Sequence, residues 1–190
     1  GQSKYAIKSG LGVGIFKGNP ASIQLAGDTG YIQDSAFSTT DDGNDGGIDF
    51  TTANDALLVG VHNGVFYIDN TTSKPTFANS VAASTTFGTN PNTNSTDGVA
   101  FVNDDPDQEY VVKADAAVGQ AIFGLCGNIN DFAAGDAKDG ASTATFDSGT
   151  QGETKMFRIV RSAEDPDNED LTAAGANIIV VINAAANTYR

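Results

Sequence analysis

The sequence predicts an all-β protein, a small antiparallel β-barrel or sandwich with long polar loops and at most one or two short helices. Three observations lead to this fold class. Short runs of β-branched and aromatic residues recur along the chain, separated by Asn-Gly and Asp-Pro-Asp turn signals. The 190 residues include 22 Gly, and Asn, Thr, Ser and Asp are abundant. Small polar residues between short apolar runs fit a loop-rich β domain better than a helical bundle.

The first clear element lies at residues 57–68, LLVGVHNGVFYI, where strand-forming residues flank Asn63-Gly64. Asn-Gly supplies the positive φ angles that a two-residue hairpin needs, so we expect two short strands joined by a tight turn here. A polar, Asn- and Thr-rich span follows at residues 79–98, which predicts a long surface loop.

Two further segments each place an Asp-Pro-Asp turn between strands, at Asp105–Asp107 and at Asp165–Asp167. Between them, residues 116–125 predict a short helix or another strand. The run at residues 177–183 is continuous and β-branched, so it predicts a buried central strand, with residues 156–160 as its antiparallel partner. The side chains expected in the core are Val59, Val61, Phe66, Ile68, Val99, Phe101, Val111, Phe157, Ile159, Ile179 and Val181.

Charge excludes several classes of partner. The chain has 24 acidic and 10 basic residues and a net charge of −14. Such a surface repels phosphate backbones and anionic lipid, so we expect binding neither to nucleic acid nor to a membrane. The sequence has no run of about 18 apolar residues, so it predicts no transmembrane helix.

The residues needed for most catalytic chemistry are scarce. The chain has a single Cys, Cys126, in an apolar run, and a single His, His62, beside the expected hairpin turn. Zinc, haem and His-based acid–base chemistry are therefore disfavoured, and we expect no enzyme, no metal and no cofactor. The acidic loop 38–49 fails the spacing of a calcium-binding EF-hand, although an adventitious Ca²⁺ site there stays open. Turn chemistry explains the clustered carboxylates better than glycoside hydrolysis does.

The ordered set LLVGVHNGVFYIDNTTSKPTFANS, VAFVNDDPDQEYVVKADAA and FRIVR…EDPDNED…GANIIVVIN resembles structural proteins of marine tailed bacteriophages, including cyanophages. More narrowly, it is similar to virion proteins found beside the major capsid protein. The resemblance spans about residues 50–183, and its most specific parts are Gly64–Phe77 and residues 165–169. Neither part is a catalytic signature.

This resemblance implies a non-enzymatic decoration or cement protein that binds the outer surface of a capsid and bridges major capsid protein subunits. It implies self-association on the capsid as well, with a trimer as one option. Residues 36–190 would form a single β domain. Residues 1–35, punctuated by Gly and Lys, would form an N-terminal segment able to bind a partner. Its candidate partner-binding residues are Tyr5, Leu11, Ile15 and Phe16.

Alternatives remain open at this stage. The N-terminal segment also fits an ordinary edge strand protected by its lysines. If it is an arm, deletion of residues 1–16 should abolish capsid binding and leave the fold intact. For the whole chain, the competing functions are a phage tail or fibre component and a Ca²⁺-dependent surface adhesin or carbohydrate-binding module. A fibre should show sequence repeats, and a carbohydrate-binding module usually exposes aromatic side chains, whereas Trp is absent here.

Overall fold

The structure is a computed structural model that describes residues 1–23, 30–34, 58–130, 135–152 and 155–184. It confirms the all-β prediction, with 50% of residues in strands and 3% in helix. The sheets are antiparallel and sandwich-like, and none of those described closes into a barrel. Among the described residues, no helix is long and apolar enough to cross a membrane.

The chain forms two compact units, each built from separate stretches of sequence. Unit 1 comprises residues 1–36, 59–105 and 132–143, and unit 2 comprises residues 37–58, 106–131 and 144–190. The sequence-based division into residues 1–35 and 36–190 does not coincide with these units, because the chain passes between them several times. Contiguous sequence blocks could not reveal such an interleaved arrangement.

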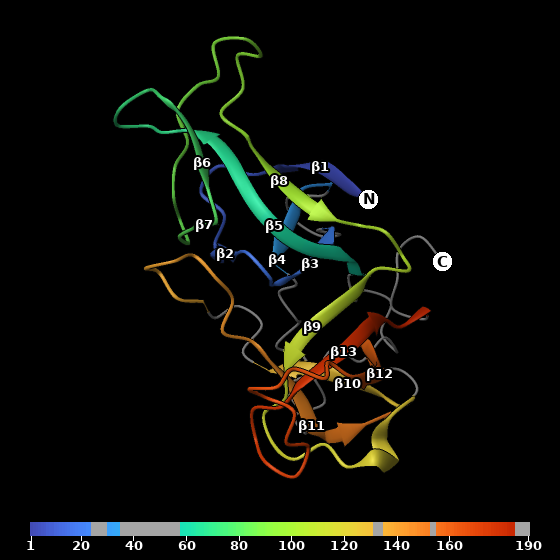
Figure 1. Cartoon of the computed structure of the whole chain (residues 1–190). Helices are drawn as coiled ribbons and strands as arrows, with labels where there is room; N and C mark the ends of the chain where they lie inside the picture. The colour runs from blue at the N-terminus through green and yellow to red at the C-terminus, as the bar shows by residue number, and fades with distance from the viewer. Residues whose placement is uncertain (24–29, 35–57, 131–134, 153–154, 185–190) are drawn as a thin grey trace. The chain divides into compact units, whose positions relative to one another are not determined.

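Unit 1 contains a six-stranded sheet in the order β1-β8-β5-β3-β4, with β6 paired to β5, and a two-stranded sheet of β2 and β7 (Figure 1). Its strands are β1 (Gln2–Ile7), β2 (Ile15–Phe16), β3 (Pro20–Ile23), β4 (Ile32–Asp34), β5 (Leu58–Ile68), β6 (Pro75–Ala78), β7 (Ser80–Val81) and β8 (Gly98–Asn103). Ile15 of β2 and Val81 of β7 belong to the same buried cluster as Val65 and Val102 of the larger sheet. The small sheet therefore helps to enclose one face of the large one.

Unit 2 contains a five-stranded sheet in the order β11-β10-β12-β13-β9. Its elements are β9 (Glu109–Lys113), the short 3-10 helix η1 (Gln120–Ile122), β10 (Cys126–Asn130), β11 (Thr145–Gln151), β12 (Phe157–Ser162) and β13 (Asn177–Ile182). The predicted hairpin between residues 156–160 and 177–183 is confirmed, because β12 and β13 pair antiparallel. Phe157, Ile159 and Ile178 are almost fully buried and form part of the core, as does Phe146 of β11.

The predicted hairpin turn at Asn63-Gly64 is wrong. Residues 58–68 form one continuous strand, β5, and the register with β8 shifts between His62 and Gly64. This shift is a β-bulge, an extra residue that bends the strand and changes which alternate side chains face the core. Gly64 has φ of +132°, a conformation that glycine tolerates and most side chains do not. The Asn-Gly pair thus correctly indicated a positive φ angle, but this angle belongs to a β-bulge and not to a hairpin turn.

The two Asp-Pro-Asp turns differ in what they connect. The turn at Asp165–Asp167 lies in the β12–β13 hairpin. The turn at Asp105–Asp107 follows β8 and precedes β9, which belong to different sheets, so the two flanking strands do not form a hairpin. The boundary between the two units falls at Asp105 and Pro106.

The predicted core is correct in part. Val59, Ile68, Phe157, Ile159 and Ile179 are buried. Five residues expected in the core are partly exposed instead, namely Val61, Phe66, Val99, Phe101 and Val181. The prediction for Val111 is wrong, because this side chain is 65% exposed. In β8 the buried positions are Gly98, Ala100 and Val102, so the strand presents its larger residues outward. The alternation of apolar and polar residues cannot identify the inner face of a strand whose two faces are both apolar.

Candidate functional site: two exposed sheet faces

Unit 1 exposes an apolar sheet face on the side away from its core. Paired residues of antiparallel strands lie on the same face, and neighbours along a strand alternate. Phe66 pairs with both Phe77 and Val99, whereas Phe101 pairs with Gly64 and with Lys4. We call this surface the aromatic face, and its residues are Lys4, Ala6, Gly64, Phe66, Phe77, Val99 and Phe101.

Three phenylalanines from three strands make contact across the aromatic face. The ring centroids of Phe66 and Phe77 are 4.6 Å apart, and those of Phe77 and Phe101 are 6.2 Å apart. Phe77 is 73% exposed although it is large and apolar. It stands on β6, which pairs only with β5 and is therefore an edge strand (Figure 1). A cluster of this kind, open to solvent on a sheet face, is typical of an interaction surface.

A shallow groove of about 360 Å³ lies beside these rings. It is lined by Asn63, Gly64, Val65, Phe77, Ala78, Asn79 and Phe101. Gly64 contributes no side chain, and a Cβ there would meet the Ala78 carbonyl oxygen at 3.2 Å. The bulge of β5 therefore places a residue without a side chain in the lining of the groove. The Asn79 amide donates a hydrogen bond to the Asp139 carbonyl oxygen at 2.9 Å, which holds one rim of the groove.

Unit 2 exposes a sheet face of different chemistry. Val111 pairs with Ile179, which also pairs with Arg161, and Val181 pairs with both Glu109 and Arg158. We call this surface the basic face, and its strand positions are Glu109, Val111, Lys113, Arg158, Arg161, Asn177, Ile179 and Val181, of which Ile179 is only 8% exposed. The opposite side of the same strands carries the buried residues Phe157, Ile159, Ile178 and Val180.

Positive charge is concentrated on the basic face. Lys113, Arg158 and Arg161 lie there, although the whole chain has only 10 basic residues. The single carboxylate on these strand positions, Glu109, accepts a hydrogen bond from Arg161 at 2.6 Å. Val111 lies among these charges on the edge strand β9. The face thus combines guanidinium groups, which bind carboxylates, with exposed aliphatic surface.

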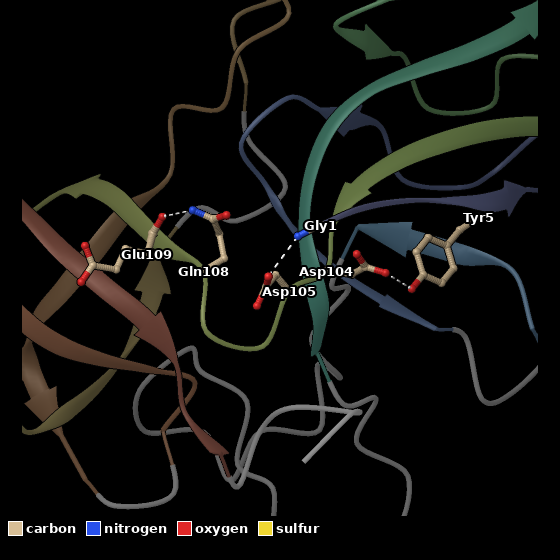
Figure 2. Close-up of polar contacts among 6 residues, drawn as sticks. All are labelled: Gly1, Tyr5, Asp104, Asp105, Gln108 and Glu109. Carbon is tan, nitrogen blue, oxygen red and sulfur yellow. Dashed lines mark hydrogen bonds and ion pairs between the residues drawn. The ribbon is translucent and has the colours of Figure 1, made fainter.

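The structure places the four predicted partner-binding residues within unit 1. Ile15 is fully buried and Leu11 is 9% exposed, and both belong to the core cluster. Tyr5 packs against that cluster, and its hydroxyl donates a hydrogen bond to Asp104 at 2.8 Å (Figure 2). A Cβ at Gly135 would overlap the ring of Phe16, so that backbone lies directly on the ring. These four residues are positioned by their own unit, and neither exposed face includes them.

The connection from unit 1 to unit 2 begins at carboxylates that bond to β1. Besides the Tyr5–Asp104 bond, the α-amino group of Gly1 lies 3.1 Å from an Asp105 carboxylate oxygen (Figure 2). Further along, the Gln108 amide donates to the Glu109 carbonyl oxygen at 2.8 Å. The two carboxylates that follow β8 therefore bond to residues in and next to β1, within unit 1.

The single histidine is a structural group of unit 1. His62 is 1% exposed, and its backbone N–H donates to the Asn19 carbonyl oxygen at 2.9 Å. Its Nε2 lies 3.3 Å from the Gln33 carbonyl oxygen, to which it donates. Burial lowers the pKa of His62 to about 4, and the hydrogen bond to Gln33 opposes this shift only in part. His62 is therefore neutral at pH 7.

Carboxylates at the turns bond to nearby backbone. Asp69 follows β5 and accepts hydrogen bonds from the backbone N–H groups of Thr72 and Thr71, which lower its pKa. Asp165 accepts from the Asp167 N–H and the Asn177 amide, with the same effect on its pKa. Among the described residues, no group of three or more His, Cys, Asp or Glu could hold a metal ion. The loop 38–49 lies outside those residues.

Comparisons with protein families, with curated proteins and with solved structures found no match to this chain.

Sequence reasoning missed both faces. It assigned Phe66, Phe101 and Val111 to the core and did not single out Phe77, Arg158 or Arg161. One signal was present in the segment FRIVR, where Phe157 and Ile159 alternate with Arg158. That pattern gives the inner and outer sides of β12. No comparable signal existed for the aromatic face, because both sides of β5 and β8 are apolar.

Proposed function

We propose that this chain is a non-enzymatic virion structural protein, a decoration or cement protein on the outer surface of a phage capsid. In this role it binds the major capsid protein and stabilises the shell by bridging neighbouring subunits. The sequence resemblance over about residues 50–183 introduces the proposal, and the structure adds one observation to its support. Each compact unit exposes a sheet face, apolar in unit 1 and basic with aliphatic surface in unit 2, so one chain offers two separate surfaces for docking.

Two surfaces are what a bridging protein requires. A single contact anchors a protein to a shell, whereas two contacts on one chain join two neighbours and raise the effective concentration of each contact. Both faces are sheet surfaces with fixed registers, which keeps the cost of ordering low when a partner binds. The most specific resembling segment, Gly64–Phe77, is the β5–β6 hairpin that carries Phe66 and Phe77.

The basic face is the surface we assign to the major capsid protein. The chain has a net charge of −14, so its other surfaces repel acidic partners, while Arg158, Arg161 and Lys113 attract them. Val111 and Val181 provide apolar area between these charges. The partner surface we expect is therefore acidic at its border and apolar at its centre.

The copy number of this chain in intact particles tests the proposal. Particles are purified from the native source, and the chain is quantified against the major capsid protein by mass spectrometry. The proposal predicts hundreds of copies in a simple ratio to the coat protein. A few or a dozen copies would instead indicate a tail or portal component, and absence from particles would overturn the virion role altogether.

One observation favours a second candidate function, binding of a glycan. The groove beside Phe77 and Phe101 combines aromatic rings with the amide side chains of Asn63 and Asn79. Aromatic surface with a few polar groups is the usual composition of a small-ligand site. A glycan array probed with the purified chain tests this function, and binding that is lost in Asn63→Ala would support it. An array without any bound glycan would remove this candidate.

A further inference from the structure

We propose that the aromatic face of unit 1 is a self-association surface, and that its partner is the aromatic face of a second copy of this chain. The inference deepens the proposed function, since copies that contact each other on a shell would link the subunits beneath them. It rests on the charge, shape and size of the aromatic face. The test uses the purified chain alone, so it can fail while the virion role holds.

Charge is the first argument. Two copies with a net charge of −14 repel each other over most of their surfaces. The outward strand positions of the aromatic face contain no carboxylate, and their only charged residue is Lys4. The nearest acidic residues along these strands, Asp69 and Asp104, follow the ends of β5 and β8. Asp139 borders the groove, where its carboxylate accepts a hydrogen bond from the Ala141 backbone N–H. The strand positions of the face, apart from this rim, let a second acidic copy approach without opposing carboxylates.

Shape is the second argument. The face carries a projecting side chain, Phe77 at 73% exposure, and next to it a groove floored by Gly64. In a two-fold dimer the same patch of each copy faces its partner, so a patch must supply both the projection and the hollow. Phe77 and its adjacent groove satisfy this condition. An isologous contact would place Phe77 of each copy against the groove of the other.

Size is the third argument, and it sets the expected strength. The residues of the aromatic face span four strands and three positions along β1, β5 and β8, which gives a footprint of roughly 200 Å² from ordinary strand spacings. Stable complexes bury about 800 Å² on each partner. The dimer is therefore weak in solution and becomes populated where copies are held close together, as they are on a shell.

Sedimentation equilibrium of the full chain tests the inference, over protein concentrations from about 10 μM to about 1 mM and at low and high salt. We expect a monomer–dimer equilibrium that strengthens several-fold at high salt, because screening weakens the repulsion between acidic copies. Phe77→Asp should weaken dimerisation at least about tenfold, as expected for a central apolar contact. Phe77→Ser separates the loss of apolar contact from the added charge, and it should weaken dimerisation as well.

Val111→Asp is the matched control. It places the same charge at a similarly exposed apolar strand position of unit 2, and it should leave dimerisation within about twofold, apart from the added net charge. A chain that stays monomeric at all concentrations overturns the inference. So does a dimer that both variants weaken equally, or one that only Val111→Asp disrupts. Binding of a glycan to the groove of a monomeric chain would assign the face to that ligand instead.

Discussion

The aromatic face and the basic face are the outer sides of two antiparallel sheets whose inner sides form cores, yet their chemistry is opposite. The aromatic face has three phenylalanines in contact and one charged residue, Lys4. The basic face has three cations and one carboxylate around exposed aliphatic side chains. An antiparallel sheet buries one side and leaves the other available, so similar architectures can bind different partners.

Because the two faces differ in charge, salt should affect the two proposed contacts in opposite directions. The proposed association through the aromatic face would bring two acidic copies together, so screening should strengthen it. The proposed association through the basic face would depend on attraction between guanidinium groups and carboxylates, so screening should weaken it. The salt dependence of each association therefore distinguishes the two contacts.

The largest expected effect comes from deletion of residues 1–16. These residues supply β1 and the buried side chains of Ile7, Leu11 and Ile15. Each buried aliphatic side chain stabilises a fold by roughly 1.5–3 kcal/mol, so the deletion should cost at least about 5 kcal/mol. We therefore expect unit 1 to unfold, contrary to the sequence-based expectation of an intact fold. Amide hydrogen exchange of each strand measures this, and undiminished protection in β5 and β8 would contradict it.

Acid should destabilise unit 1 before unit 2. Unfolded His62 binds a proton below its usual pKa of about 6.5, whereas folded His62 resists protonation until about pH 4. The contribution of His62 to the free energy of unfolding of unit 1 is therefore fully present above pH 6.5. It falls by about 3 kcal/mol as the pH drops to 4. The pKa values of Asp165 and Asp170 in unit 2 are lowered by hydrogen bonds, so their contribution is lost only at more acidic pH.

Urea denaturation at pH 7.0 and pH 4.5 checks this difference. Amide hydrogen exchange in β5 reports on unit 1, and exchange in β13 reports on unit 2. His62→Gln is the control, and it should flatten the pH dependence of β5 in this window. Equal acid sensitivity of β5 and β13, or a dependence that survives in His62→Gln, would contradict the assignment.

Charge reversal on the basic face should weaken binding to shells. Arg158→Glu combined with Arg161→Glu should lower affinity for undecorated shells at least about tenfold, because both cations then repel an acidic partner. Lys74→Glu combined with Lys138→Glu makes the same change of net charge on exposed residues of unit 1. Co-sedimentation with purified shells compares the two variants, and an equal loss in both would show that net charge alone governs binding.

The smallest expected effect is on stability. Val111→Asp replaces an exposed side chain, so it should change the free energy of unfolding by no more than about 0.5 kcal/mol. Phe77→Asp also removes the ring contacts with Phe66 and Phe101, so it should cost roughly 1–2 kcal/mol. Chemical denaturation of both variants measures this. A loss of several kcal/mol in either variant would mean that its side chain supports the fold, and that its effect on association has another cause.

Much of the fold was predictable from residue patterns. The continuous β-branched run at 177–183 identified β13, and its partner β12 followed from the neighbouring Asp-Pro-Asp turn. The bulge in β5 was not predictable, because Asn63-Gly64 signals a positive φ that serves a turn or a bulge equally well. Only the pairing of His62 and Gly64 with β8 decides between them.

The candidate site was less predictable than the fold. Phe66 and Phe101 lie outside the core because Val65, Ala100 and Val102 occupy the inner positions of their strands. The sequence carries no polar alternation in these strands, so the choice of inner face depends on tertiary packing. Arg158 was detectable, because it sits between two buried apolar residues of β12.

Hydroxyl-radical footprinting of Phe77 and Val111, compared between the free chain and the chain on intact particles, measures whether both faces are covered on the particle. Both side chains are exposed in the isolated chain, at 73% and 65%, and should label readily there. We expect labelling of both residues to fall several-fold on particles, because each face then has a partner. Unchanged labelling of both residues on particles would contradict the claim that this chain docks through these two faces.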